Sequence, residues 1–254
     1  MLTVKGVVLT QRQVGEQDQY IDILTDEYGV LEVLVKGAKK LTSKGGPAAQ
    51  LFAYSTFCLR PAKRGYALNS AEPIRIFYGL RNSVSAVALA SYFSQVIQFA
   101  VLPQACTQEI QRLFLNSLHF LSEQTHPQAR IKAVFELRMA SLLGFMPDVV
   151  MCRYCGNYLP AELCFSVEQG GFCCRDCLPE SETYTQIIPM PAAALQAIRH
   201  VVLRDFERIF SFRLSDAAET AFRHFAEAFL LYHMDHRFPA LDYYKAMAQE
   251  LPGS

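Results

Sequence analysis

The sequence predicts an α+β multidomain protein in which a small N-terminal β barrel precedes a helical domain that carries a cysteine-rich insertion. Three observations support this fold class. The first 80 or so residues contain short runs of Val, Ile, Leu, Tyr and Phe separated by turn residues, whereas later segments space their apolar residues three and four apart. Six of the eight cysteines lie between residues 152 and 177.

Residues 1–80 are expected to form an OB-type barrel of five short strands. The runs TVKGVVLT, YIDILTD, VLEVLVKG and YSTFCLR are typical of strands, and turn-rich stretches such as VGEQDQ and GAKKLTSKGGPA separate them. A five-stranded OB barrel fits this length, and such barrels offer a groove for an oligonucleotide.

Residues 81–149 and 181–254 are expected to form the two parts of the helical domain. Apolar residues recur at helical spacing in three segments of the first part, namely 83–101, 108–121 and 129–143. In the second part, Pro191 suits the first helical position of a fourth helix, and Ser215 suits the N-cap of a longer fifth helix.

The insertion at residues 150–180 has the cysteine spacing of a zinc site. Cys152 and Cys155 form one C-x-x-C pair, Cys174 and Cys177 form another, and eighteen residues separate the pairs. Four thiolates leave no open coordination position, so we expect one structural Zn²⁺ per chain. An alternative set replaces Cys174 by Cys173, which makes the second pair C-x-x-x-C. Disulfides and a dithiol redox enzyme are further alternatives, which the lack of a signal sequence and of a thioredoxin-like unit disfavours.

No catalytic motif accompanies these cysteines. The sequence contains no phosphate-binding glycine loop, no H-E-x-x-H and no G-x-S-x-G, so we predict that the protein is not an enzyme. We expect Cys164 and Cys173 to be free, partly buried thiols. A zinc- or thiol-dependent enzyme would instead require one of these two cysteines for activity.

Positive charge is concentrated near the N-terminus of a chain whose net charge is zero. Residues 1–81 contain eleven Lys and Arg against seven Asp and Glu, and no acidic residue occurs from Val33 to Ala71. Such a one-signed segment predicts a polyanion-binding surface, the alternative being a solvated loop. The candidate DNA-binding residues are Lys36, Lys39, Lys40, Lys44, Arg60, Lys63 and Arg64. Tyr54, Phe57 and Tyr66 could stack on bases or fill the barrel core.

Four stretches together resemble the RecO family, the bacterial recombination mediators of the RecF pathway. GVVLTQRQVGEQDQYIDILTDEYGVLEVLVKGAKK resembles the family's OB domain, and FELRMASLLGFMPDVVMCRYCG resembles the turn and first knuckle of its zinc-containing branch. The second knuckle resembles F-S-V-x-x-x-G-F-x-C-x-x-C, an alignment that selects Cys174 as the ligand. The stretch FRHFAEAFLLYHMDHRFPALDYY resembles the family's final helix.

This resemblance implies sequence-independent binding of single- and double-stranded DNA, annealing of complementary strands, and help in loading RecA onto DNA coated by the single-stranded-DNA-binding protein. It also implies RecR and the acidic C-terminal tail of that coating protein as partners. Because a receptor for this tail should combine cations with an apolar pocket, we consider Arg130, Lys132, Phe135 and Arg138 as candidates.

The competing hypothesis is a zinc-ribbon adaptor that acts through protein contacts without direct DNA binding. It explains the neutral net charge, but it leaves the acid-free basic segment without a role. No apolar stretch approaches the roughly 20 residues of a membrane span. We therefore expect a cytoplasmic, nucleoid-associated protein with no membrane partner.

Overall fold

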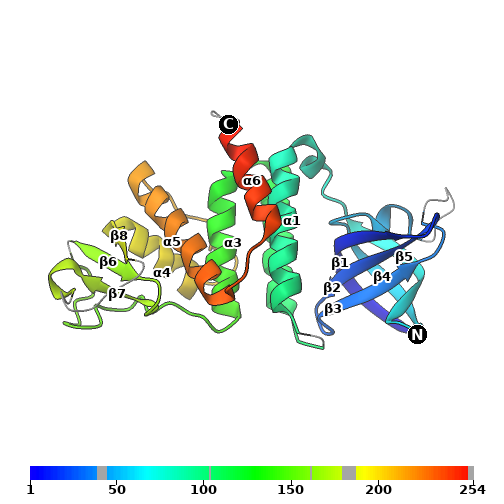
Figure 1. The fold of residues 1–254 in the computed structure, drawn as a ribbon, viewed down its shortest axis with the longest axis horizontal. Coiled ribbons are helices and arrows are strands. Elements are labelled where there is room, and N and C mark those ends of the chain that lie inside the picture. Colours follow the sequence, from blue (N-terminus) through cyan, green and yellow to red (C-terminus); the bar gives the residue numbers. More distant parts are fainter. Residues whose placement is uncertain (39–44, 103, 161, 179–186, 251–254) are drawn as a thin grey trace. The chain divides into compact units, whose positions relative to one another are not determined.

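The computed structural model describes residues 1–38, 45–102, 104–160, 162–178 and 187–250 (Figure 1). It divides into two compact units, of which the first holds Met1–Thr125 and the segment from Phe238 onward, and the second holds His126–Arg237. In the first unit, helices pack on the barrel and on one another, and in the second unit the cysteine module packs on a helix. The finer boundaries expected after residues 80, 149 and 180 remain predictions.

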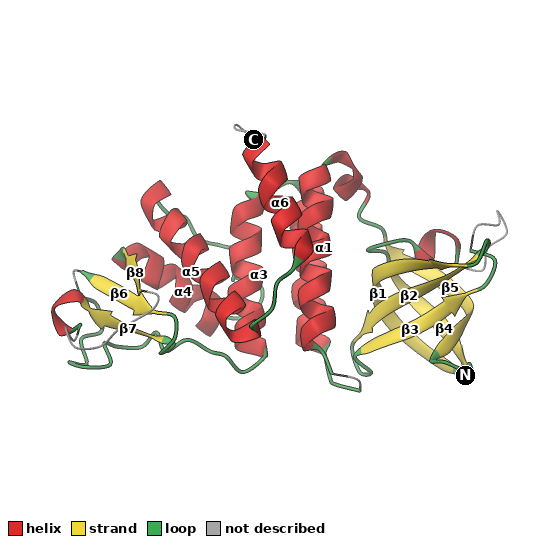
Figure 2. Cartoon of the chain, in the orientation of Figure 1, coloured by secondary structure: helices red, strands yellow, loops and turns green. Residues whose placement is uncertain are grey.

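The first unit begins with a closed barrel of five strands (Figure 2). The strands are β1 (Leu2–Val14), β2 (Asp18–Thr25), β3 (Val30–Val35), β4 (Tyr54–Pro61) and β5 (Tyr66–Arg75). Their order around the barrel is β1-β2-β3-β5-β4, and β3 and β5 form the one parallel pair among antiparallel neighbours. This arrangement confirms the predicted OB-type barrel.

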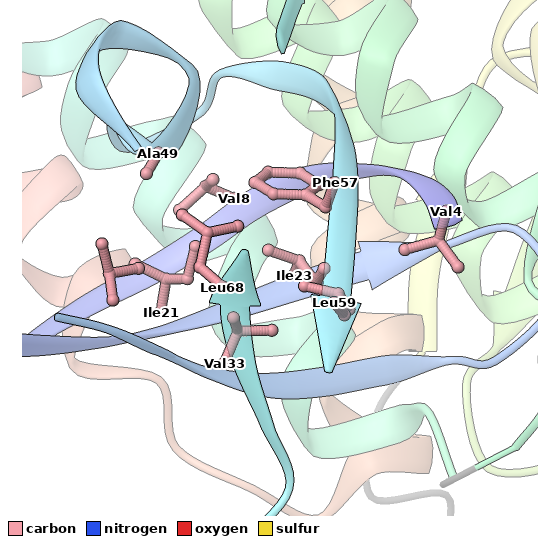
Figure 3. Close-up of a cluster of buried hydrophobic side chains, with 10 residues drawn as sticks. Val4, Val8, Ile21, Ile23, Val33, Ala49, Phe57, Leu59 and Leu68 are labelled. Atoms are coloured by element: carbon pink, nitrogen blue, oxygen red, sulfur yellow. The ribbon is translucent and has the colours of Figure 1, made fainter. Parts of the chain in front are cut away.

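The barrel interior is filled by alternate residues of each strand (Figure 3). On β2, Ile21 and Ile23 point inward, so Tyr20 and Asp22 belong to the outer face. Phe57 of β4 is fully buried among these aliphatic side chains. The short helix η1 (Gly46–Ala49) contributes Ala49 to the same core.

Three helices and the short helix η2 (Tyr78–Asn82) complete the first unit. They are α1 (Val84–Ala100), α2 (Gln108–Glu123) and α6 (Pro239–Glu250). The hydroxyl of Ser83 caps α1 by accepting from the backbone N–H of Ala86 at 3.2 Å. Phe238, just before α6, packs edge-on against Tyr92 with ring centroids 5.7 Å apart.

The second unit contains three helices and a small antiparallel sheet. The helices are α3 (Gln128–Leu142), α4 (Ala192–Leu203) and α5 (Asp216–Met234). The sheet has the order β7-β6-β8, built from β6 (Leu163–Ser166), β7 (Gly171–Cys174) and β8 (Ile187–Met190), and the short helix η3 (Arg175–Cys177) follows β7. Phe165 of β6 contacts Phe225 of α5 with centroids 4.2 Å apart, which fixes the sheet on the helix.

The predicted helices are confirmed, with small shifts at their ends. Ser215 is the N-cap of α5 as expected, whereas Pro191 is the N-cap of α4 and lies one residue before its expected position. The final helical stretch is divided in two, because Asp235 adopts a left-handed conformation with φ 43° and ends α5. None of the described helices is both long enough and apolar enough to traverse a lipid bilayer.

Candidate metal centre and nucleic-acid interface

The two C-x-x-C pairs meet at one point of the second unit. The sulfur atoms of Cys152, Cys155, Cys174 and Cys177 all lie within 4.8 Å of one another, and those of Cys155 and Cys174 are 3.5 Å apart. Four sulfurs bound tetrahedrally at about 2.3 Å would be separated by about 3.8 Å. The cluster therefore fits a metal ion bound tetrahedrally by four thiolates.

Local backbone structure brings each pair into position. The N–H of Gly156 donates to the carbonyl of Cys152 at 2.8 Å, and Gly156 adopts φ +74°, which a glycine accepts without strain. On the other side, Cys174 is the last residue of β7, and the single turn of η3 returns the chain so that Cys177 faces the same point. The N–H of Cys174 donates to Sγ of Cys152 at 3.3 Å, a link of the kind that stabilises a thiolate.

The thiols of the cluster differ in acidity. Burial opposes ionisation of Cys152, but backbone N–H groups of Cys155, Cys174 and Tyr154 outweigh it and lower the pKa of Cys152 to about 6. Burial raises the pKa of Cys174, and the neighbouring Cys155 and Cys152 raise it further. The neighbouring thiols thus oppose one another's ionisation, and a cation among the sulfurs would favour their thiolate forms.

Cys164 and Cys173 lie opposite each other on β6 and β7 and outside the four-sulfur cluster. Both are free and buried, and burial raises the pKa of each thiol, that of Cys173 to about 11. These two residues therefore act as small apolar side chains of the sheet. The sulfur atom of Cys174, and not that of Cys173, lies with the sulfur atoms of the other three candidate ligands.

The described cations of the candidate DNA surface flank the outer face of β2 and β3. Lys36 directly follows β3, next to the β1–β2 turn, where the N–H of Gly37 donates to Asp18 at 2.8 Å. Arg60 lies near the end of β4, and Lys63 and Arg64 lie in the β4–β5 turn. All four are exposed. Lys39, Lys40 and Lys44 lie outside the described residues.

The face between these cations carries both signs of charge. Arg12 of β1, which the sequence reasoning missed, donates to Glu32 at 2.7 Å and to Asp22 at 3.1 Å, and hydrogen bonding to Glu32 raises the pKa of Arg12. Arg64 binds the other oxygen of Glu32 at 2.8 Å. The alternation of β1 and β2 could have revealed Arg12, because it pairs directly with the outward-facing Tyr20.

The aromatic candidates do not share one environment. Phe57 belongs to the barrel core, and Tyr66 packs against that core from its edge. Tyr20 is half-exposed on the outer face, where its strand neighbours are Arg12 on β1 and Leu34 on β3. Tyr20 is therefore better placed than Phe57 to contact a base.

The four residues considered for the acidic tail are engaged inside the second unit. Phe135 is fully buried, and Lys132, which is 6% exposed, contacts Glu136 at 2.7 Å and Glu227 at 2.6 Å. Arg130 binds Glu219 through two nitrogens, with the shorter contact at 2.9 Å. Arg138 donates to the carbonyls of Val201 and Val202 on α4. This is an internal charge network, so it does not support an exposed apolar receptor built on Phe135.

Comparisons with known proteins cover almost the entire chain. The family model described as recombination protein O N terminal matches residues 1–77, and the one described as recombination protein O C terminal matches residues 81–242.

Several proteins that match more than nine-tenths of this chain carry the name of the same family. A protein of Acetivibrio thermocellus named DNA repair protein RecO is 28% identical over 246 residues, which are 97% of each chain. A protein of the same name from Alkaliphilus metalliredigens is 24% identical over 92% of this chain and 94% of its own length. Another from Caldicellulosiruptor saccharolyticus is 23% identical over 96% and 98%.

Proposed function

Because the chain belongs to the RecO family of DNA repair and recombination proteins, we propose that it binds single- and double-stranded DNA on the outer face of β2 and β3. The observation that carries this proposal is the placement of Lys36 beside the β1–β2 turn and of Lys63 and Arg64 in the β4–β5 turn, at the two borders of that face. OB barrels bind oligonucleotides on this face and these two loops. Lys39, Lys40 and Lys44 belong to the proposal on the basis of their sequence position alone.

The proposed contacts are to phosphates and therefore independent of base sequence. Lysine and arginine side chains neutralise the backbone and release counterions, so affinity falls steeply with salt. Tyr20 offers one ring for stacking, which tolerates any base. A surface of this kind holds strands reversibly, which suits annealing of complementary strands and transfer of coated DNA to RecA.

Bound zinc would act as a structural clamp. Cys152, Cys155, Cys174 and Cys177 would hold it and would connect the loop after α3 to the end of β7. The energy of metal binding, on the order of 10 kcal/mol, would thereby stabilise the small sheet. The protein would act without chemistry of its own, as a cytoplasmic, nucleoid-associated mediator.

Family membership also suggests RecR and the acidic tail of the single-stranded-DNA-binding protein as direct partners and RecA as an indirect one. The zinc-ribbon adaptor remains the second candidate because apolar side chains surround the first knuckle. Val150, Met151, Tyr154 and Leu159 are all exposed there. Such a surface is typical of a protein contact.

A titration of labelled single-stranded DNA by fluorescence anisotropy tests the DNA proposal. The double variant Lys36→Glu/Lys63→Glu should weaken binding by at least about tenfold at low salt and reduce the salt slope. The control Lys5→Glu/Arg223→Glu changes the net charge equally at two exposed sites off this face and should bind as the wild type does. Equal weakening in both variants would contradict the assigned surface, and no binding by the wild type would favour the adaptor.

A second test changes the ion pairs of Glu32 and should raise the affinity for DNA, where the first test lowers it. Glu32 holds both Arg12 and Arg64, so Glu32→Gln frees Arg64 and leaves Arg12 paired with Asp22 alone on the proposed face. DNA affinity at low salt should rise severalfold, since the protein no longer exchanges a carboxylate for a phosphate. Unchanged or weaker binding in the same anisotropy assay would show that these arginines do not meet DNA.

A further inference from the structure

A cavity of about 750 Å³ in the second unit is lined by cations, and none of the described residues in its wall is acidic. It lies between α4, the segment that precedes α5, and the loop of the first knuckle. Its charged and aromatic lining comprises Tyr158, Arg199, His200, Arg204, Phe212 and Arg213. The volume is that of an ordinary ligand site, and the charge predicts an anionic ligand.

The buried member of this set is Arg199, and no carboxylate of the described residues forms an ion pair with it. Its side chain is 5% exposed and donates to three backbone carbonyls, those of Val149 at 2.6 Å, Val150 at 2.8 Å and Tyr158 at 2.7 Å. Nη1 of Arg199 is buried and has no hydrogen-bond partner among the described residues. Carbonyl oxygens satisfy donors but do not neutralise a full charge, so an anion in the cavity would stabilise Arg199.

Two further arginines are available at the cavity. Arg204 and Arg213 are exposed, and no carboxylate in the described part of the chain pairs with either. An arginine usually forms an ion pair when a carboxylate lies nearby, as Arg130 does with Glu219 in the same unit. The cavity thus offers three guanidinium groups whose charge nothing in the described structure neutralises.

Tyr158 gives the cavity an aromatic platform. The guanidinium carbon of Arg199 lies 3.9 Å from the centroid of the Tyr158 ring, yet 56% of this tyrosine is exposed. A cation stacked at this distance orients the ring and leaves its outer side to solvent. Cations beside an exposed, oriented ring are the arrangement with which proteins bind single-stranded nucleic acid.

We propose that this cavity is a second binding site for single-stranded DNA, in which Arg204 and Arg213 meet phosphates, a base stacks on Tyr158, and Arg199 orients that ring and adds positive charge from behind it. The inference rests on the proposed DNA function and adds a site outside the barrel, so that one molecule can hold two strands to be annealed. An acidic peptide with an apolar end fits less well, because the described aliphatic lining is limited to two alanines, Leu214 and Leu203, of which Leu203 is itself 55% exposed.

The chain contains no tryptophan, which permits a local test. In the full-length variant Tyr158→Trp, the single indole reports stacking in this cavity by fluorescence quenching, while anisotropy of labelled DNA reports total binding. Oligothymidylate should quench the indole, an abasic oligomer of equal length should quench it far less, and Arg213→Glu in this background should weaken the quenching titration by about tenfold. The control Arg223→Glu, on α5 and outside the cavity, should leave the titration unchanged.

The outcomes separate the two proposals. Anisotropy without quenching would overturn the second site and leave the barrel site intact, whereas quenching that survives Lys36→Glu/Lys63→Glu would support the cavity even if the barrel assignment fails. Quenching by an acidic peptide but not by oligothymidylate would overturn the proposal in favour of a protein partner. Should Tyr158→Trp fold poorly, as judged by circular dichroism, the exposed Arg204→Glu gives the same test by anisotropy in an otherwise native chain: unchanged affinity would refute the site.

Discussion

Removal of the Lys132 ammonium should be among the most damaging single changes to the second unit. Lys132 of α3 lies 2.7 Å from Glu136, which is fully buried, and 2.6 Å from Glu227. The variant Lys132→Met keeps the unbranched apolar part of the side chain but removes the ammonium, which leaves the carboxylate of Glu136 buried beside an apolar group. Breaking one partner of a buried ion pair in this way costs about 3–5 kcal/mol.

This loss can be measured as a shift in the thermal midpoint of the unit. For a unit of this size, a destabilisation of that magnitude lowers Tm by about 10 °C or more. The assay is thermal unfolding of the full chain in the presence of zinc, followed by circular dichroism. Arg223→Met, at an exposed position on α5, should shift Tm by no more than a degree or two and serves as the control.

A double substitution distinguishes a buried charge from lost packing. Lys132→Met/Glu136→Leu replaces both charges by apolar groups and should recover most of the lost stability, because hydrophobic replacement of a buried pair is often neutral. Although burial opposes ionisation of Lys132, Glu136 and Glu227 together raise its pKa above 10.5. A group whose pKa rises on folding contributes fully below its unfolded value, so the wild-type contribution should be constant from pH 6 to 9 and lost only in strong alkali. A Tm unchanged by Lys132→Met would refute the reasoning.

Three further predictions concern the zinc module, a partly buried histidine and a glycine contact. Cys152→Ser should abolish stoichiometric zinc, measured by a chromophoric chelator, and should make the region around residues 150–178 sensitive to proteolysis, as chelation of the wild type should. Burial lowers the pKa of His233, which stacks on Phe145 at 4.8 Å, below 6.5, so its stabilising contribution is present above that pH and is lost as the pH falls. Lowering the pH from 7.5 to 5.5 should therefore reduce the Tm of His233→Phe less than it reduces the Tm of the wild type. In Gly79→Ala the new Cβ would lie 2.1 Å from the carbonyl oxygen of Ser122, so urea unfolding should show a loss of about 1–3 kcal/mol, and an unchanged midpoint would exclude a rigid contact there.

The barrel and the cysteine cluster could be predicted because the information for both is local. Period-two alternation decides which residues of a strand face the core, and the two residues within each C-x-x-C pair decide how its sulfurs converge. The choice between Cys173 and Cys174 follows the same rule: neighbouring residues of β7 point to opposite sides, so Cys174 joins the sulfur cluster and Cys173 lies opposite Cys164.

The charges of α3 show where sequence reasoning reaches its limit. Arg130, Lys132 and Arg138 look like a basic helix face because their partners are distant in sequence. Glu219 and Glu227 follow 89 and 95 residues later on α5, and the carbonyls that receive Arg138 belong to α4. Only tertiary packing reveals that these cations are internal. The unit boundary has the same origin, since α6 returns to α1 after the entire second unit has been completed.

The charge balance of the barrel bears on how a neutral chain could handle DNA. Arg12 and Arg64 already share Glu32, and Asp22 receives hydrogen bonds from both Arg12 and Gln98, so a phosphate approaching this face must compete with carboxylates. Competition of this kind lowers affinity and makes exchange fast. Weak, rapidly exchanging contacts suit a mediator that must release each strand after pairing. A face of cations alone would bind the first strand so tightly that the contacts could not be exchanged for those of the second strand. In a protein that anneals strands, the acidic residues between the flanking lysines and arginines are therefore expected to set the rate at which DNA leaves, and Glu32 is the position at which that rate can be changed.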